Sequence, residues 1–227
     1  MFLKKYKSVL IIILIFIIFT IQIVSASTLP LMDTIITIDA GHGGRDSGTT
    51  YNNILEKDIN LEISKELEKE LTKKGAITYM IRESDIDLSS IYDAKKKRGD
   101  LYRRLMFIKE KSSDLYLSIH INWYKNQNYK GGEVLYNPIN KDNKLLATYI
   151  MNEFKNELNS KRSIKTTDLY MYKNTTTPGV LIECGYLSNY IDRKSLQDKK
   201  YQEKLAKVIT NGVIKYLKYK NKVKYIL

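Results

Sequence analysis

Cysteine and proline are scarce in this chain of 227 residues, which contains one Cys and three Pro. Cys184 has no second cysteine to pair with, so a scaffold held together by intrachain disulfides is excluded. With only 11 Gly besides, the composition is not that of a collagen or a flexible linker. Hydrophobic residues make up 43% of the chain, enough for a sizeable core, and the length is typical of one globular domain.

Acidic residues are outnumbered, with 25 Asp and Glu against 38 Lys and Arg, which gives a net charge of +13. Such an excess attracts polyanions, and nucleic acid, an anionic membrane and an anionic cell-wall polymer are all candidates. A lysine-rich surface that is merely solvated explains the charge equally well. Charge alone therefore does not choose a partner.

Residues 1–26 have the pattern of an export leader. Three lysines precede an apolar run from Val9 to Val24, and Val24-Ser25-Ala26 is similar to a signal-peptidase site. The run is short for a spanning helix, which needs about 20 residues, so a cleaved signal peptide and an uncleaved membrane anchor both remain open. Either predicts an extracytoplasmic domain, secreted or anchored, whose membrane contact is limited to this segment. Export also argues against nucleic acid as the partner.

The rest of the chain reads as one domain over residues 33–218, followed by a basic tail at 219–227. No linker-like stretch or internal repeat divides it. Removing residues 1–26 removes three lysines and no acid, which leaves a net charge of +10. The basic excess therefore belongs to the domain.

Short β-rich runs alternate with longer amphipathic segments along the domain. Strands are predicted at 34–38, 76–81, 115–121, 133–136, 169–172 and 179–184. Helices are predicted at 55–73, 91–111, 143–158 and 201–217. The alternation predicts an α/β sandwich with helices on both faces of the sheet. In such sheets, ligands bind at the carboxyl ends of the strands.

The chain has two histidines, and each follows a predicted strand. His42 lies in the glycine-rich stretch Asp39-Ala40-Gly41-His42-Gly43-Gly44, and His120 ends Leu117-Ser118-Ile119-His120. A single histidine after an apolar run is usually a core or loop residue. Two of them at strand ends, one in a loop whose glycines allow close approach to a bound species, indicate a ligand pair.

Two acids complete the candidate site. A catalytic zinc site needs a third ligand and an open position, and Glu56 at the start of a helix is the candidate, although the helix dipole alone also favours a glutamate there. Glu183 ends the apolar run Val180-Leu181-Ile182. A charge at that position is costly unless it is paired or functional, which favours a functional role.

Four motifs, in order, resemble those of the zinc-dependent N-acetylmuramoyl-L-alanine amidase family. They are Asp39-Ala40-Gly41-His42-Gly43-Gly44, Leu55-Glu56-Lys57-Asp58, Ser118-Ile119-His120-Ile121-Asn122 and Ile182-Glu183-Cys184-Gly185-Tyr186-Leu187-Ser188-Asn189. The resemblance covers roughly residues 34–218. The stretch from Arg162 to Pro178 is most similar to the sporulation-associated CwlD branch.

The resemblance implies a mixed, roughly six-stranded sheet between helices. It implies one Zn²⁺ held by His42, Glu56 and His120, with Glu183 as the catalytic acid–base residue. The implied reaction is hydrolysis of the amide between N-acetylmuramic acid and L-alanine in peptidoglycan. In the CwlD branch this reaction is a step towards muramic-δ-lactam in spore cortex. An accessory envelope protein of unknown identity is a further expected partner.

Several alternatives stay open at this point. Cys184 could be the nucleophile of a different hydrolase, with a histidine as its base. The chain could instead be a non-catalytic peptidoglycan-binding envelope protein with a structural zinc, or a zinc carboxypeptidase that cuts elsewhere in the stem peptide. Asn122 is either a substrate contact or an ordinary loop residue, and Trp123, Tyr124 and Tyr129 either stack on sugar rings or pack locally.

Overall fold

A mixed six-stranded sheet forms the centre of the computed structural model, which describes residues 7, 9, 11–14 and 29–224. Across the sheet the order is β4 (Ile77–Met80), β1 (Ile35–Ala40), β5 (Leu115–Asn122), β8 (Gly179–Tyr186), β6 (Glu133–Tyr136) and β7 (Lys165–Thr166). The first four strands are parallel, and β6 runs antiparallel to β8 and parallel to β7. The expected mixed α/β architecture is confirmed.

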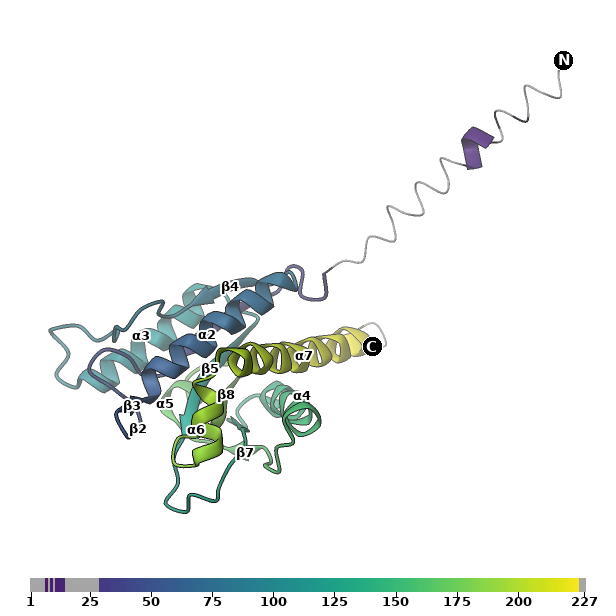
Figure 1. Ribbon diagram of the computed structural model, residues 1–227. Helices are drawn as coiled ribbons and strands as arrows, with labels where there is room; N and C mark the ends of the chain where they lie inside the picture. Colours follow the sequence, from purple (N-terminus) through teal and green to yellow (C-terminus); the bar gives the residue numbers. More distant parts are fainter. Residues whose placement is uncertain (1–6, 8, 10, 15–28, 225–227) are drawn as a thin grey trace.

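Helices cover both faces of this sheet. On one face lie α2 (Glu56–Lys73), α4 (Lys141–Leu158) and α7 (Lys199–Lys224), with α2 and α7 side by side in Figure 1. The other face is covered only in part, by α3 (Lys96–Glu110) and the short α5 (Tyr170–Lys173). A hairpin of β2 (Thr50–Tyr51) and β3 (Ile54–Leu55) precedes α2, and α6 (Tyr190–Leu196) follows β8.

Alternation along the strands sorts side chains between the two faces. On β5, Leu117 and Ile119 enter the larger core under α2, α4 and α7. Tyr116 points to the smaller core under α3 and α5, because neighbouring residues of a strand face opposite sides. His120 shares the side of Tyr116 by the same rule. The partly covered face is therefore the one that carries the site.

The strand predicted at 169–172 is wrong, because residues Tyr170–Lys173 form helix α5. The backbone N–H of Tyr172 donates to the carbonyl of Leu169 (3.1 Å), which closes a turn. Met171 and Tyr172 are both buried in the smaller core. A strand would send these neighbours to opposite faces, so one turn of helix satisfies both.

Two helix ends also differ from the prediction. Helix α3 begins at Lys96 rather than at 91, since the Asp93 carboxylate accepts from the backbone N–H of Ser90 (2.6 Å) and holds that segment in a turn. Helix α7 continues beyond 217, through the first part of the predicted tail at 219–227, and ends at Lys224. This extension packs on α4, where Lys220 Nζ contacts the Asp142 carboxylate at 2.6 Å.

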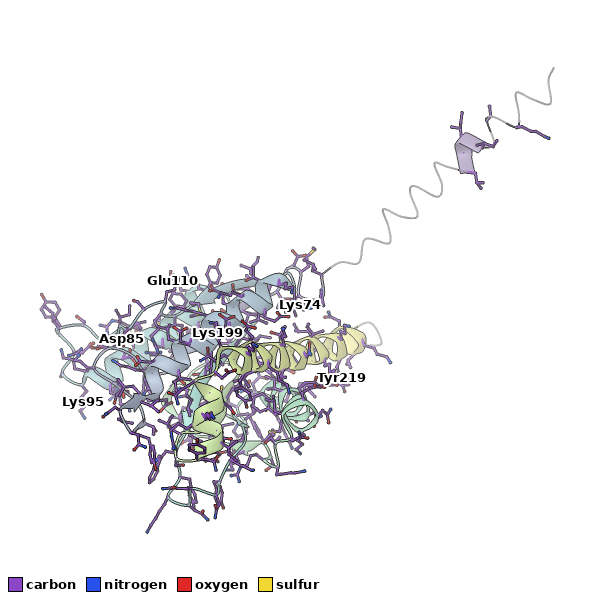
Figure 2. All side chains as sticks on the ribbon, viewed as in Figure 1. Lys74, Asp85, Lys95, Glu110, Lys199 and Tyr219 are labelled. Carbon is purple, nitrogen blue, oxygen red and sulfur yellow. The ribbon has the colours of Figure 1, made fainter. Side chains whose placement is uncertain are left out.

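Charged side chains on the surface link helices that are distant in sequence. Lys199, labelled in Figure 2, contacts the carboxylate of Glu66 on α2 at 2.7 Å. The predicted leader at 1–26 lies mostly outside the described residues. Within the described part of the chain, no helix has the length and apolar character that crossing a membrane requires.

Candidate metal centre and active site

Three predicted ligands meet at the carboxyl ends of β1 and β5. His42, Glu56 and His120 each offer a ligand atom, and these atoms lie within 4.8 Å of one another. His42 Nε2 lies 3.3 Å from Glu56 Oε1, and His120 Nδ1 lies 3.1 Å from the same oxygen. The two imidazole rings are 4.9 Å apart and nearly perpendicular, and one nitrogen of each faces Glu56 Oε1.

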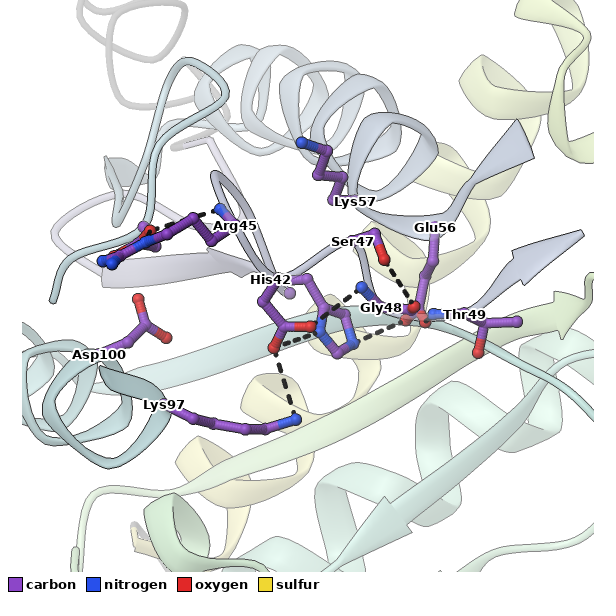
Figure 3. Close-up of polar contacts among 12 residues, drawn as sticks. His42, Arg45, Ser47, Gly48, Thr49, Glu56, Lys57, Lys97 and Asp100 are labelled. Atoms are coloured by element: carbon purple, nitrogen blue, oxygen red, sulfur yellow. Dashed lines mark hydrogen bonds and ion pairs between the residues drawn. The ribbon is translucent and has the colours of Figure 1, made fainter. Parts of the chain in front are cut away.

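A second carboxylate orients His42. Its Nδ1 lies 3.0 Å from Asp46 Oδ2, while its Nε2 faces Glu56 (Figure 3). Asp46 in turn contacts Lys97 Nζ at 3.4 Å. A carboxylate on the far nitrogen is the usual outer partner of a metal-ligating histidine, because it fixes the tautomer and the ring orientation. Nε2 is therefore the His42 atom that could bind a metal ion.

Glu56 is held by backbone donors on both oxygens. Oε2 accepts from the N–H of Thr49 (2.7 Å, Figure 3), and Oε1 accepts from the N–H of Ile121 (3.1 Å). Burial alone raises the pKa of Glu56, but hydrogen bonds with His120 and His42 outweigh it and hold that pKa far below its ordinary value. The residue is thus ionised, as a metal ligand must be.

Gly41 gives the His120 ring its space. A Cβ at position 41 would lie 2.3 Å from His120 Cε1. We expect Gly41→Ala to push the ring away from Glu56 and to weaken zinc binding by about 10- to 100-fold, the range seen when the support of a ligand is lost. Competition with a zinc-sensitive dye measures the affinity.

Gly212→Ala is the matched control for this substitution. Its Cβ would lie 2.7 Å from Ile150 Cα, which is also a crowded position, between α7 and α4. It should lower stability and leave zinc affinity within about twofold of the wild type, since sites without shared partners act independently. Equal zinc affinities for the two variants would contradict the packing role of Gly41.

Glu183 lies next to the cluster on β8, where it pairs in register with His120 on β5 and with Glu133 on β6. The side chain is half-buried, and its Oε2 is shielded from solvent without a hydrogen-bond partner among the described residues. Burial, together with the charges of Glu56 and Glu133, raises the pKa of Glu183 well above that of a free carboxylic acid. Such a shift is common at functional sites.

One cavity joins these groups. It has a volume of about 270 Å³, and its lining includes His42, His120 and Glu183. Leu101 of α3, with Leu169 and Tyr172 at α5, forms an apolar wall. A few converging polar groups in a partly apolar hollow are typical of a small-molecule or substrate site.

Two buried arginines hold the loop that carries His42. Arg82 donates to the carbonyls of Ala40 (2.8 Å) and Gly41 (3.0 Å). Arg104 donates to the carbonyl of His42 (2.6 Å) and contacts the Asp39 carboxylate at 2.6 Å. His42 has a φ of 61°, a conformation that residues other than glycine rarely adopt, so it needs such support.

Removal of Arg104 should therefore destabilise the fold. We expect Arg104→Ala to cost about 3–5 kcal/mol, because it leaves the buried Asp39 without its charge partner. Urea unfolding measures the loss. Arg103→Ala is the matched control, since the Arg103 side chain is 37% exposed and its ion pair with Asp93 lies at the surface. Its effect should be small, and comparable losses for both variants would contradict this account.

The end of β5 and the loop after it hold the residues whose roles the sequence left open. Asn122 Nδ2 donates to Glu133 Oε1 (3.0 Å), so this side chain holds a buried carboxylate. Tyr124 and Tyr129 pack on each other with ring centroids 4.4 Å apart, and Trp123 is half-exposed. Sequence reasoning missed Asp46, Arg82, Arg104 and Glu133. One sequence signal was available for Arg104. It lies four residues after Asp100 in a predicted helix, a spacing that favours an ion pair between the two side chains.

The fold and the site together define an α/β domain with a three-residue cluster of the kind that holds a metal ion. Residues 36–215 match the family described as N-acetylmuramoyl-L-alanine amidase. The chain therefore belongs to the N-acetylmuramoyl-L-alanine amidase family, as its four motifs predict, and it is an amidase of that family.

Individual relatives agree with this assignment. A germination-specific N-acetylmuramoyl-L-alanine amidase of Bacillus subtilis (strain 168) is 37% identical over 194 residues, covering 83% of this chain and 82% of that protein. The CwlD amidase of Clostridioides difficile, solved in complex with the GerS lipoprotein, has a TM-score of 0.78 and 35% identity, covering 82% of this chain and 100% of that one. An amidase of Clostridium difficile 630 has a TM-score of 0.73 and 31% identity, covering 82% and 97%.

Proposed function

We propose that the chain hydrolyses the amide between N-acetylmuramic acid and L-alanine in peptidoglycan with one Zn²⁺ held by His42, Glu56 and His120. The observation that carries the proposal is the convergence of these three ligand atoms beside the shielded oxygen of Glu183. Two imidazoles and one carboxylate are a common donor set for catalytic zinc. When bound there, Zn²⁺ supplies Lewis-acid activation of water and of the scissile carbonyl.

We assign the proton transfers to Glu183. Its carboxylate takes the proton of the attacking water and later gives it to the departing amine of L-alanine. The C–N bond breaks, and the lactyl carboxylate and a stem peptide with a free amino terminus are formed. Because a nearby divalent cation favours the ionised form of a carboxylate, Glu183 can start the cycle as a base despite its burial.

The position of Glu183 favours a catalytic site over a purely structural one. A structural zinc site is closed by four protein ligands, whereas a catalytic site has three and leaves a position open. Among the described residues, the metal-binding group consists of His42, Glu56 and His120 and does not include Glu183. This supports an enzyme rather than a binding protein with a structural zinc.

Cys184 is a poor nucleophile in this setting. It is 1% exposed, it belongs to the larger core, and burial raises its thiol pKa well above the ordinary value. We expect Cys184→Ala to keep kcat within about threefold of the wild type while lowering stability through the lost packing. A peptidoglycan hydrolysis assay and thermal unfolding test this. Loss of activity in a folded variant would instead support Cys184 as the nucleophile of a thiol hydrolase.

We further propose that the chain acts outside the cytoplasm, in spore-cortex formation, with an accessory envelope protein of unknown identity. The germination-specific relative supports the role in spore-cortex formation, and with it a place outside the cytoplasm. The CwlD–GerS complex of C. difficile supports the accessory protein. Spores of the parent organism that lack this chain should contain little muramic-δ-lactam. Normal lactam content in such spores would contradict the cortex role.

Chemical labelling of cleaved ends tests the proposed reaction. Zinc-loaded full-length chain, incubated with purified peptidoglycan, should release free L-alanine amino termini without new reducing sugar ends. New reducing ends would indicate a glycosidase, and new amino termini on a residue other than L-alanine would indicate a peptidase. Either result would overturn the proposal.

A further inference from the structure

The site has a neighbouring charged cluster on the same face of the sheet. His120, Glu183 and Glu133 are opposite one another on β5, β8 and β6, in that order. Adjacent strands are about 4.8 Å apart, so Glu133 lies about 10 Å from His120 across the sheet. The row thus runs from the proposed metal ligand, past the proposed base, to a third acidic residue.

Glu133 is 1% exposed, and both of its oxygens have partners. Oε1 accepts from Tyr186 Oη (2.8 Å) and from Asn122 Nδ2. Oε2 contacts Lys165 Nζ at 2.7 Å and Arg162 Nη2 at 3.4 Å. Two cations thus meet one buried carboxylate, and the shorter contact belongs to Lys165. Arg162, Lys165 and Glu133, taken together, therefore have a net charge of +1.

The guanidinium of Arg162 is held in place, but not all of its N–H groups have hydrogen-bond partners among the described residues. Its Nη2 also donates to Tyr186 Oη (3.1 Å), and its guanidinium lies 4.6 Å from the ring centroid of Tyr129 and 5.5 Å from that of Tyr186. Among the described residues, Nε is shielded from solvent without a hydrogen-bond partner, and the hydrogen bonds of the guanidinium come from Nη2, which leaves Nη1 free. The side chain is 21% exposed, so part of it still reaches solvent.

A guanidinium that is held by aromatic rings and a buried acid, and whose Nη1 is free to donate, is suited to bind a carboxylate. Stem peptides offer one at a matching distance. The residue after L-alanine is a glutamate joined through its side chain, which leaves its α-carboxylate free. Two residues of extended peptide span at most about 7 Å, enough to reach from Glu183 past Glu133 on the adjacent strand, which is about 4.8 Å away.

We propose that Arg162 binds the free α-carboxylate of the second stem-peptide residue, with Glu133, Tyr129 and Tyr186 as its positioning residues. This inference rests on the proposed function, since it assumes that the scissile amide lies at Glu183. Arg162 then favours stem peptides whose second residue has a free carboxylate over stem peptides whose second residue has a carboxamide in its place. Lys165 offsets the charge of Glu133 and leaves the guanidinium available.

Two matched peptidoglycan fragments test the proposal, identical except that the second residue carries a carboxylate or a carboxamide. For the zinc-loaded full-length chain, we expect kcat/KM to be about 10- to 100-fold higher for the carboxylate, the range for a hydrogen bond to a charged group. Arg162→Gln should bring the ratio close to 1 by lowering only the carboxylate value. Arg162→Lys should leave an intermediate ratio, since it keeps the charge without the planar fork.

Lys161→Gln is the control, because it removes an equal charge from the adjacent, exposed position and should keep the full ratio. Thermal unfolding confirms that each variant is folded. Equal rates of the wild type on both fragments, or equal losses on both in Arg162→Gln, would overturn the carboxylate site. Cleavage of neither fragment by the wild type would instead count against the proposed function. Calorimetry with the two released dipeptides then tests the carboxylate site, with the same ratio expected in affinity.

Discussion

Glu183→Gln should bind zinc as tightly as the wild type and lose turnover by a factor of about 10²–10⁴ or more, the typical contribution of a positioned general base. The amide nearly matches the carboxylate in shape but cannot accept the proton of water. Because Glu183 Oε2 has no partner in the described part of the chain, the exchange breaks no hydrogen bond in the fold. Equilibrium dialysis for zinc and the rate of stem-peptide release measure the two quantities.

Glu66→Gln is the matched control for this variant. Glu66 is a buried glutamate on α2 that pairs with Lys69 and Lys199 and is not among the residues that line the cavity. We expect it to change stability without changing kcat. If Glu183→Gln loses zinc instead of turnover, Glu183 is a metal ligand, and the assignment of a general base is wrong.

His120→Ala should lose zinc and activity together. Loss of an outer-shell partner typically weakens metal binding by 10–100-fold, so loss of a direct ligand should weaken it by at least about 100-fold. The ring also contacts Glu56 Oε1 at 3.1 Å, so its removal leaves that buried acid with one imidazole partner fewer. Zinc analysis after gel filtration and the peptidoglycan assay provide the measurements.

Chelation of the wild type is the control for His120→Ala. Removing zinc should abolish activity, and adding one equivalent should restore it, because the three ligands remain in place. The variant should not recover under the same addition. Recovery of His120→Ala at stoichiometric zinc would mean that the ion is held elsewhere.

Residues that sit at strand ends could be predicted from the sequence. Hydrophobic periodicity located β1, β5 and β8, and parallel strands bring their carboxyl ends to one edge, so His42, His120 and Glu183 were expected together. Glu56 was a candidate for the third ligand from the sequence alone, but only the family resemblance favoured it over the ordinary explanation of a glutamate in a first helical turn. Strand β6 was also predicted, but nothing in the sequence indicated a role for Glu133.

Residues that act through tertiary contacts could not be predicted in this way. Arg82 and Arg104 reach the loop carbonyls from segments about 40 to 65 positions away in sequence, a relation that no local pattern records. The error at 169–172 has a similar origin. Its apolar and aromatic residues suit a strand, but Met171 and Tyr172 both face the smaller core, which favours a helical turn.

Zinc titration of the metal-free, full-length chain tests the central claim most directly. The rate of peptidoglycan cleavage is followed at each zinc addition, and the products are identified by mass spectrometry. The account predicts a rate that rises linearly and levels off at one zinc per chain, with products limited to intact glycan and stem peptides that begin at L-alanine. A rate independent of zinc, or products cut at another bond, would contradict it.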